Sequence, residues 1–510
     1  MNSSSTFNHL LANLEKAPIL SVFLTALALR WLLLLIGFED FWGDAHHNLI
    51  MSKLTLDNGF VYSDFKDRHL AWLPLYRYWG SFIMLITGSY SLLAMNIVNS
   101  VLGAFTASLS AWLGIKLLDR KSAVLIGLAV ALMPYLIVFS VANMAEMMGG
   151  LLLLAWFASI YREKYVLVVL FSGLAVLTRE ELTVLIGLSV LPLFYFKNYK
   201  GVIYSISGIM IGLGIWSWMA YINSGNPLNW LLERFESTTR STSYYADEGN
   251  FWVDNILVPI TTLVQAFPLV IFFVWLKKPA KSETLSERKW HLLLGYITIS
   301  FWLFFFIAQF KVIANPDPRF FVLTLPISIV WFISLWKRGY FKAFVSERLV
   351  FGFLALTLLQ LIVPYYRQYN LEPRKAAGEW LQVHTSEEVI WSDMAVSIVE
   401  SKRDPGDFLS TDKLLIAEYG SFDVEASLIK SAIVEHDIEY ITSYKAPFNH
   451  THMIWPQLES MQPFEWEGIT FIPVFEYTPF RMETFSINGF LRQQFEAPLY
   501  SSSVWKIYSN

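Results

Sequence analysis

The chain has 510 residues, of which 55% are hydrophobic and only 16% are charged, and it contains 20 tryptophans and 40 phenylalanines. This composition is too apolar for a water-soluble protein with an ordinary surface and is typical of a multi-pass membrane protein. The formal net charge of -4, with no long run of Lys or Arg, argues against a nucleic-acid partner, and the absence of cysteine excludes disulfides, thiolate metal sites and cysteine nucleophiles.

Apolar segments long enough to cross about 30 Å of hydrocarbon, roughly 20 residues each, occupy the first three-quarters of the chain. We predict eleven membrane helices, at 18–38, 91–116, 122–140, 145–161, 165–178, 181–196, 201–222, 255–276, 290–310, 319–336 and 348–366. The fifth and sixth are short, which leaves open two tilted helices or one broken hairpin. The first shows no small-residue cleavage signal, so we expect it to be retained.

Basic residues at the ends of membrane helices accumulate on the cytoplasmic side. About fifteen of them fall in alternate loops of this chain, against about five in the opposite short loops. The basic loops carry Lys116, Arg120, Lys121, Arg162, Lys164, Lys197, Lys200, Lys277, Lys278, Lys281, Arg288, Lys289, Lys337, Arg338 and Lys342. We expect these loops to be cytoplasmic, which places the loop 39–90 and everything after residue 366 on the extracytoplasmic face of a plasma (inner) membrane. An endoplasmic reticulum membrane would suit the same arrangement.

The predicted outer loop 39–90 is long and acidic. Within it, AHHNLIMSKLTLDNG at 45–59 is predicted to be an amphipathic helix that ends at Asn58-Gly59. The stretch PLYRYWGSFIMLITG at 74–88 is apolar, but it is short for a span and contains Arg77, so we predict a second helix lying at the membrane interface. Counting it as a span would also place the basic loops outside.

After residue 366 charge increases and short alternating segments replace the long apolar runs. We therefore divide the chain into a membrane part, 1–366, and an extracytoplasmic soluble α/β domain, 367–510. In this domain we predict a helix at 378–385, a turn at 404–407 and strands at 388–393, 438–444, 471–477 and 504–510. Periodicity does not fix the strand order, and no Gly-rich phosphate loop or metal-ligand spacing is evident.

Two acids stand where polar groups meet the membrane, and charges there are costly enough to indicate function. Asp44 follows the first apolar segment, and Glu146, in NMAEMM, opens the fourth on the same predicted face. The alternatives are a solvated loop acid for Asp44 and, for Glu146, an acid that stabilises a helix N-terminus. Two acids from different segments on one face favour a shared site.

Arginines occur on the same predicted face. Arg179, in LTREEL, and Arg319, in PDPRFF, could bind phosphate oxygens, which match the guanidinium fork. The alternative is that Arg179 pairs with Glu180 or Glu181 and that Arg319 pairs with Asp317, closing loop charges only.

Three further residues are candidates for substrate binding: Arg68, His69 and Glu180. Arg68 and His69 precede the second interfacial helix, and a solvated loop face is the alternative for both. Arg30 lies inside the first apolar segment and is expected to extend toward the outer interface, toward Glu39 or toward a bound anion.

The order of these motifs resembles the GT-C superfamily of polytopic membrane glycosyltransferases. The layout is most similar to its protein O-mannosyltransferase and lipid A aminoarabinose-transferase branches. The motifs are GDAHHN with Asp44, LDNG, WLPLYRYW, NMAEMM with Glu146, TREE with Arg179 and PDPRFFVLTLP with Arg319. The likeness covers roughly residues 18–366, with a looser likeness over 370–510.

The resemblance implies an α-helical GT-C-like protein that transfers a sugar from a polyprenyl-phosphate donor to a hydroxyl of a protein, lipid or glycan acceptor at the extracytoplasmic face. It implies that Asp44 and Glu146 are the catalytic acids of the first and second outer loops, and that Arg319 is the basic residue before the aromatic-Leu-Pro segment. For such a transfer we expect Asp44 to take the acceptor proton, and Arg319 with Arg179 to stabilise the phosphate. A single displacement would invert the anomeric centre, and a divalent cation is left open.

Two other classes of protein remain open. A transporter would place ionisable residues near the midplanes of discontinuous helices within inverted repeats, whereas here the charges gather on one face and no repeat is found. A noncatalytic lipid- or glycan-binding membrane protein could use the same outer cleft without an activated base.

Overall fold

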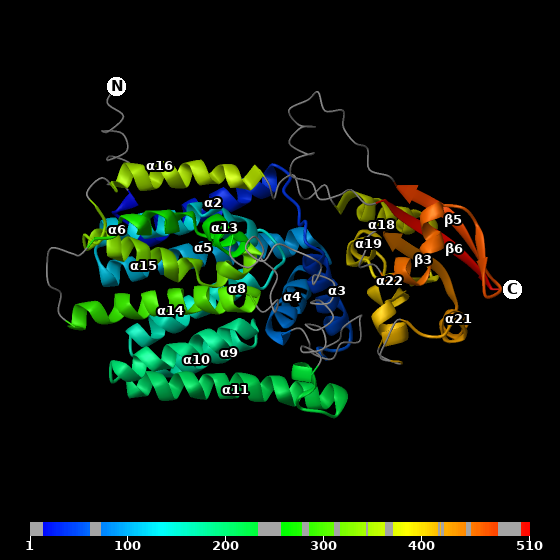
Figure 1. The fold of residues 1–510 in the computed structure, drawn as a ribbon, viewed down its shortest axis with the longest axis horizontal. Coiled ribbons are helices and arrows are strands. Elements are labelled where there is room, and N and C mark those ends of the chain that lie inside the picture. The colour runs from blue at the N-terminus through cyan, green and yellow to red at the C-terminus, as the bar shows by residue number, and fades with distance from the viewer. Residues whose placement is uncertain are drawn as a thin grey trace, which may run out of the picture.

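The computed structural model describes residues 14–61, 73–232, 257–277, 285–310, 317–342, 345–362, 371–416, 419, 423–444, 450–477 and 501–509. The chain forms a bundle of helices followed by a C-terminal α/β part, as predicted (Figure 1). The helices of the bundle are α2 (Pro18–Leu35), α5 (Leu92–Leu117), α6 (Arg120–Leu132), α7 (Pro134–Ser140), α8 (Glu146–Tyr161), α9 (Tyr165–Val176), α10 (Glu180–Tyr195), α11 (Tyr199–Ser224), α13 (Val258–Ala266), η2 (Pro268–Trp275), α14 (Leu285–Phe310), η3 (Pro318–Leu323), α15 (Leu325–Lys337), α16 (Glu347–Thr357) and η4 (Leu358–Leu361).

Every predicted apolar segment contains helix, but not every one is a full-length span. Among the described residues, four helices are long and apolar enough to cross a membrane, or six if each of two bent pairs counts as one span. The predicted spans 122–140 and 255–276 are these bent pairs, with angles of 64° between α6 and α7 and 101° between α13 and η2. Pro134 and Pro268 open the second member of each pair, and proline breaks a helix because it lacks the N–H donor and clashes with the preceding turn.

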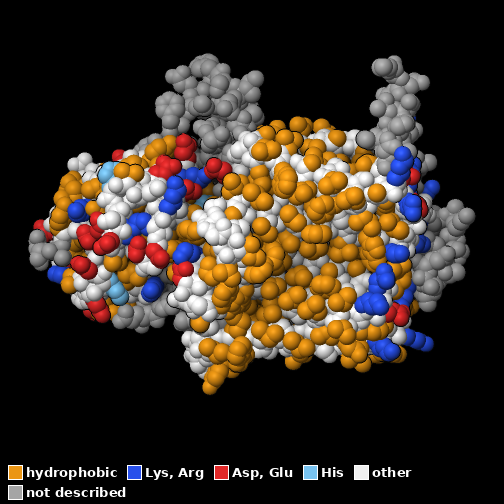
Figure 2. Space-filling model, turned by 180° about the vertical axis from the view of Figure 1, so that it is seen from behind, with side chains coloured by type: hydrophobic (Ala, Val, Ile, Leu, Met, Phe, Trp, Pro, Cys, Tyr) orange, Lys and Arg blue, Asp and Glu red, His pale blue; other side chains and the backbone are white. Residues whose placement is uncertain are grey.

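The surface of the bundle is apolar along its flank and basic at one end. Hydrophobic side chains cover the flank in a broad band, and Lys and Arg gather at the end away from the C-terminal part (Figure 2). At this end Lys121 and Lys337 both pair with Glu347, at 3.0 and 2.7 Å. The two predicted basic loops that carry Lys121 and Lys337 therefore lie together, as expected for the cytoplasmic side of a membrane protein.

Two helices, α3 (Gly43–Asp57) and α4 (Pro74–Thr87), lie at the other end of the bundle, next to the C-terminal part (Figure 1). They confirm the two helices predicted in the loop 39–90. The helix α4 ends at Gly88, whose φ of +63° favours glycine. The two helices approach closely, because a side chain at Gly80 of α4 would collide with Ser52 of α3.

The C-terminal part contains a six-stranded sheet with the order β2-β1-β3-β6-β5-β4. The strand β1 pairs in parallel with β2 and β3, and the other neighbours pair antiparallel. Its elements are α18 (Glu372–His384), β1 (Val389–Trp391), α19 (Ala395–Glu400), η6 (Pro405–Asp407), β2 (Phe408–Leu409), η7 (Asp412–Ile416), α21 (Ala426–Glu435), β3 (Ile438–Tyr444), α22 (His450–Ile454), η8 (Pro456–Ser460), β4 (Phe464–Trp466), β5 (Ile469–Tyr477) and β6 (Ser502–Ser509). The predicted helix, turn and four strands are confirmed. The strands β2 and β4, of 2 and 3 residues, were not predicted.

A hydrophobic cluster joins the C-terminal part to the bundle. Leu49 and Ile50 of α3 and Ile83 of α4 belong to the same buried cluster as Ile390 of β1 and Ile398 of α19. Full burial of an aliphatic side chain of this size contributes about 1.5–3 kcal/mol. The sheet therefore packs on α3, the helix whose first turn contains the predicted catalytic acid Asp44.

Candidate active site

Asp44 occupies the first turn of α3. The backbone is extended at Trp42 and becomes helical at Gly43, so the carboxylate of Asp44 lies near the positive end of the helix dipole. Arg319 Nη1 donates a hydrogen bond to Asp44 Oδ2 at 2.6 Å. Asp317 accepts a hydrogen bond from the Arg319 backbone N–H at 2.9 Å and lies 3.4 Å from its Nε. The local pair of Arg319 and Asp317 therefore exists, but it accompanies a long-range pair with Asp44.

Glu146 forms a second ion pair. It is the first residue of α8 and is 1% exposed, and Arg179 Nη1 donates to its Oε1 at 3.2 Å. Arg179 also donates to both carboxylate oxygens of Glu181, at 2.8 and 3.2 Å. Within the described part of the chain, the other oxygen of Glu146, Oε2, is buried and accepts no hydrogen bond. A buried acceptor without a donor is costly, so Oε2 would gain from a donor group brought to it.

Phe320 brings the two ion pairs together. The guanidinium carbons of Arg179 and Arg319 lie 5.6 and 5.1 Å from the centroid of its ring. A cation over an aromatic face is attracted by the ring quadrupole, so Phe320 favours both positions. The segments that follow α9 and precede α15 are thereby held side by side at the α3 end of the bundle.

A pocket opens beside these pairs, with about 430 Å³ of space when its open mouth is included. Its lining comes from α3, α4, the start of α8 and the junction between α9 and α10. The charged lining residues are Asp44, Arg77, Glu146, Arg179 and Glu180. Carboxylates accept hydroxyl hydrogens and guanidinium groups bind anions, so the pocket suits a ligand that has both a hydroxyl and an anionic group.

Charge and burial determine the protonation of this region. Partial burial raises the pKa of Asp44, but the charge and hydrogen bond of Arg319 outweigh it, and the pKa lies below its usual value of 3.8. Asp44 is therefore a carboxylate at neutral pH. Burial lowers the pKa of His46 to about 3, although its Nδ1 contacts Trp42 O at 3.1 Å, so this imidazole is neutral.

Asn143 connects the helices that carry the two acids. Its Nδ2 donates to Ala45 O at 2.8 Å, and Asn48 Nδ2 donates to Asn143 O at 2.8 Å, which ties it to the first turns of α3. Its Oδ1 accepts a hydrogen bond from Tyr76 OH of α4 at 2.9 Å. Because Asn143 closely precedes Glu146, these bonds set the position of α3 relative to the start of α8.

Asp40 completes this buried network. It is 1% exposed, its Oδ1 accepts from Asn143 N at 3.1 Å, and its Oδ2 accepts from Asn96 Nδ2 at 2.9 Å. Burial raises the pKa of Asp40 to about 7 in spite of these two hydrogen bonds. Asn99 of α5 donates to Tyr76 OH at 2.6 Å, so the network also reaches the bundle.

Five of the seven predicted site residues meet here: Asp44, Glu146, Arg179, Glu180 and Arg319. Arg68 and His69 lie outside the described residues.

Sequence reasoning missed other residues of this region, among them Arg77, Asn48, Tyr76 and Asn143. Arg77 indicated only that α4 is not a membrane span, and single amides and tyrosines are too common in proteins to indicate a site.

Arg30 is placed differently from the expectation. It is fully buried inside the bundle instead of reaching the interface, Glu39 or an anion. It donates to Ser140 Oγ at 2.6 Å, to Ala26 O at 2.9 Å and to Leu136 O at 3.4 Å. Hydrogen bonds to helix carbonyls replace the water that a snorkelling side chain would seek.

The Asp44 and Glu146 carboxylates at the pocket are engaged by arginines, and the described residues show no group of three metal ligands there. The one group that they contain, Asp393, Asp412 and His450, lies in the C-terminal part. Its members follow different strands and are far apart in the sequence, which is why no ligand spacing was evident.

Comparisons with known proteins bear on this arrangement. No protein-family model matches the chain, and no curated protein sequence matches it either. The structure is similar to ArnT from Cupriavidus metallidurans bound to undecaprenyl phosphate, with a TM-score of 0.57 at 12% identity, covering 97% of each chain. The chain has a GT-C-like fold. The oligosaccharyltransferase AglB from Archaeoglobus fulgidus, in complex with an inhibitory peptide and a dolichol-phosphate, gives a TM-score of 0.45 at 11% identity, covering 84% of this chain and 70% of that one.

The predicted fold class is therefore confirmed, including the C-terminal α/β part. The similarity of ArnT and this chain extends over both parts of the molecule, because 97% of each chain is covered. At 12% identity it concerns the GT-C-like fold alone, and the roles of individual residues depend on the geometry described above.

Proposed function

We propose that the protein is a membrane glycosyltransferase that moves a sugar from a polyprenyl-phosphate donor to an acceptor hydroxyl. The observation that supports this most directly is the meeting of two carboxylate–guanidinium pairs, Asp44 with Arg319 and Glu146 with Arg179, beside one pocket at one end of a helical bundle. The undecaprenyl phosphate bound to the similarly folded ArnT supports a lipid-phosphate donor.

In the proposed reaction the acceptor oxygen attacks the anomeric carbon of the sugar. The bond from that carbon to the lipid phosphate breaks, and the phosphate leaves with the electron pair. Asp44 takes the hydroxyl proton, for which its ionised carboxylate is suited. The charge that develops on the phosphate is stabilised by guanidinium groups that are already in position. One displacement on one face inverts the anomeric centre.

Arg319 has two roles in this proposal. While it pairs with Asp44 it lowers the pKa of that carboxylate and makes it a weak base. A donor phosphate offers Arg319 a second anionic partner with matching fork geometry. Movement of Arg319 toward the phosphate would weaken its bond to Asp44 and make the carboxylate a better base only when the donor is in place.

Glu146 is proposed to orient the acceptor or the sugar. Its Oε1 is engaged by Arg179, while its buried Oε2 accepts no hydrogen bond within the described residues. A sugar or acceptor hydroxyl would satisfy this oxygen once the side chains that cover it move aside. Arg179, held by Glu146 and Glu181, would then present its positive charge to the phosphate.

The membrane orientation is also part of the proposal. The basic end of the bundle would face the cytoplasm, and the pocket and the C-terminal domain, 367–510, would face outward. A lipid donor then reaches the pocket laterally from the outer leaflet, and the acceptor approaches between the membrane part, 1–366, and the α/β domain.

Purified protein in lipid nanodiscs tests the function. A panel of undecaprenyl-phosphate sugars is supplied with an extract of the host envelope as acceptor, and release of undecaprenyl phosphate is measured. We expect Asp44→Asn to slow release by at least about 100-fold, because the replacement cannot take a proton. Asp57→Asn is the matched control, since Asp57 lies on the same helix and pairs with Lys53.

Turnover of the donor by Asp44→Asn at the wild-type rate would overturn the proposed role of this carboxylate. Donor binding measured on the same variant separates the alternatives. A noncatalytic receptor would bind the lipid sugar in both forms and release no phosphate from either. A transporter would move the lipid sugar across the membrane and leave its phosphate bond intact.

A further inference from the structure

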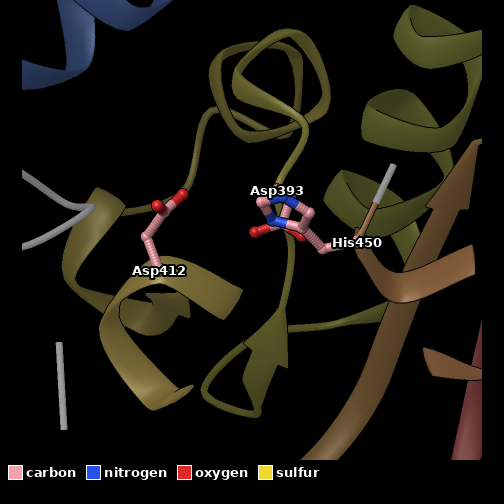
Figure 3. Close-up of side chains that lie close together, drawn as sticks. All are labelled: Asp393, Asp412 and His450. Atoms are coloured by element: carbon pink, nitrogen blue, oxygen red, sulfur yellow. The ribbon is translucent and has the colours of Figure 1, made fainter. Parts of the chain in front are cut away.

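Three side chains of the C-terminal domain converge from three loops, as Figure 3 shows for Asp393, Asp412 and His450. Asp393 follows β1, Asp412 opens the short π-helix η7 after β2, and His450 opens α22 after β3. Because β2, β1 and β3 run parallel, their carboxyl ends meet at one edge of the sheet. The three residues therefore share that edge.

This edge is the place where open α/β sheets bind ligands. The chain leaves β1 for β2 on one side and later returns to β3 on the other, so the strand order β2-β1-β3 reverses beside β1. Ligands of such sheets bind at the carboxyl ends of the strands, in the crevice where the order reverses. Asp393 and His450 follow the two strands that flank this crevice.

The donor set suits a divalent transition-metal ion. One carboxylate oxygen from each aspartate and one imidazole nitrogen lie within 4.8 Å of one another. Ligand atoms bound to a common zinc ion at about 2.0–2.2 Å are roughly 3–4 Å apart, so small side-chain rotations close the remaining gap. The mixed oxygen and nitrogen donors favour Zn²⁺ or Mn²⁺ over Mg²⁺ and Ca²⁺, which prefer oxygen alone.

Asp393 is held in place by residues outside the group. Thr411 donates to it twice, from its backbone N–H at 2.8 Å and from its hydroxyl at 2.6 Å. The buried Trp391 donates its indole N–H to the Thr411 hydroxyl at 2.9 Å, which leaves the hydroxyl hydrogen directed at Asp393. Supporting hydrogen bonds of this kind orient carboxylates that bind metals.

Asp412 adds an electrostatic argument. Its side chain is only 2% exposed, and it stands beside a second carboxylate whose position is fixed. Two carboxylates at this separation repel each other, and burial removes the water that would screen them. A cation bound between them would attract both carboxylates.

We propose that Asp393, Asp412 and His450 bind one Zn²⁺ or Mn²⁺ ion at the carboxyl edge of the parallel strands. With three protein ligands the ion keeps an open coordination position, which can hold water or an anionic group of a ligand. The ion would join the loops after β1, β2 and β3 and stabilise the domain that rests on α3. This site is separate from the pocket, and its occupancy does not depend on the proposed sugar transfer.

The test is metal binding to the full chain in detergent, purified with a tag that lacks histidine. After treatment with a chelator, the protein is dialysed against Mn²⁺ or Zn²⁺, and bound metal is measured by mass spectrometry and, for Mn²⁺, by electron paramagnetic resonance. We expect about one ion per wild-type chain and a rise in Tm with metal concentration. His450→Gln and Asp412→Asn should each weaken binding by at least about 10-fold.

His436→Gln and Asp437→Asn are the controls, because both residues are exposed in the same domain, at the end of α21. They should bind metal as the wild type does. Circular dichroism checks the fold of each variant, and Asp412→Asn is the safer one because asparagine has the same shape. The proposal is overturned if wild-type protein binds no ion, or if His450→Gln and Asp412→Asn bind as much as the two controls.

Discussion

Arg319 and Asp44 form a 2.6 Å ion pair across 275 residues of sequence. The pair joins the start of η3, where Asp317 holds the arginine, to the first turn of α3. It therefore couples the carboxylate proposed as the base to the cation proposed to bind the phosphate, and it makes the protonation of Asp44 depend on where Arg319 points.

This coupling predicts a change in the pH dependence of transfer. Arg319 lowers the pKa of Asp44, so Arg319→Gln raises that pKa and moves the acid limb of the pH–rate profile to higher pH. Arg319→Lys retains a charge and should leave the limb near its wild-type position, while the rate falls by roughly 10- to 100-fold because lysine lacks the planar fork. Values of kcat/KM, which report the free enzyme, measured from pH 2.5 to 9 decide this. An acid limb that stays in place in Arg319→Gln would show that another group titrates.

The pairing of Arg179 with Glu146 and Glu181 predicts that loss of the arginine destabilises the protein more than loss of one acid. Arg179→Met leaves Glu146 and Glu181, whose side chains are 1% and 12% exposed, without their guanidinium, and a loss of about 3–5 kcal/mol is expected. Glu146→Gln leaves Arg179 bound to Glu181 and should cost only about 1–2 kcal/mol. Thermal unfolding in detergent measures both. Equal losses in the two variants would contradict the shared pairing.

Asn143 is expected to affect activity by holding α3, which carries Asp44, in position against α8, which carries Glu146. Asn143→Ala removes the hydrogen bonds to Ala45 and Tyr76, which should cost about 2–3 kcal/mol and slow transfer by loosening α3 against α8. Asn198→Ala is the control, because Asn198 caps α11 through the Gly201 N–H, and loss of a cap costs about 1 kcal/mol. Assays run well below both unfolding temperatures should show slower transfer only in Asn143→Ala. Equal transfer rates in Asn143→Ala and Asn198→Ala would show that Asn143 contributes to stability but does not position the site.

Asp40 predicts a pH-dependent stability. Its folded-state pKa of about 7 lies above the ordinary 3.8, so between these values the folded state holds a proton that the unfolded state has lost. The free energy of unfolding therefore falls as pH rises through this window, by up to about 1.4 kcal/mol per pH unit, and the effect levels off above pH 7. The stability difference between wild type and Asp40→Asn, followed from pH 4.5 to 8, should change in this direction. A constant difference would argue against a protonated Asp40.

The membrane orientation can be checked by cysteine labelling, because the chain has no cysteine of its own. His436→Cys in the C-terminal domain should react with a membrane-impermeant maleimide in intact cells. Lys164→Cys, in an exposed loop between α8 and α9, should react only after the cells are permeabilised. The opposite pattern would place the pocket in the cytoplasm and remove the access to the outer leaflet that the proposal requires.

Local sequence patterns were enough to predict the helices, the α/β domain and the gathering of charge at one end. Hydropathy and helix signals depend on neighbouring residues, so α3 and α4 could be recognised without any tertiary information. Asp44 and Glu146 stood out because carboxylates at membrane boundaries are rare and costly. The breaks at Pro134 and Pro268 show the limit of the pattern, since an apolar run does not reveal that its helix bends.

Only the tertiary structure showed which residues pair with one another at the site. Arg179 could have paired with its sequence neighbours alone, and it was packing on Phe320 and against α8 that brought it to Glu146. The same holds for Asn143, whose amide meets α3 and α4 only in the folded chain. The group of Asp393, Asp412 and His450 was invisible because strand order, which periodicity does not encode, decides which loops share an edge of the sheet.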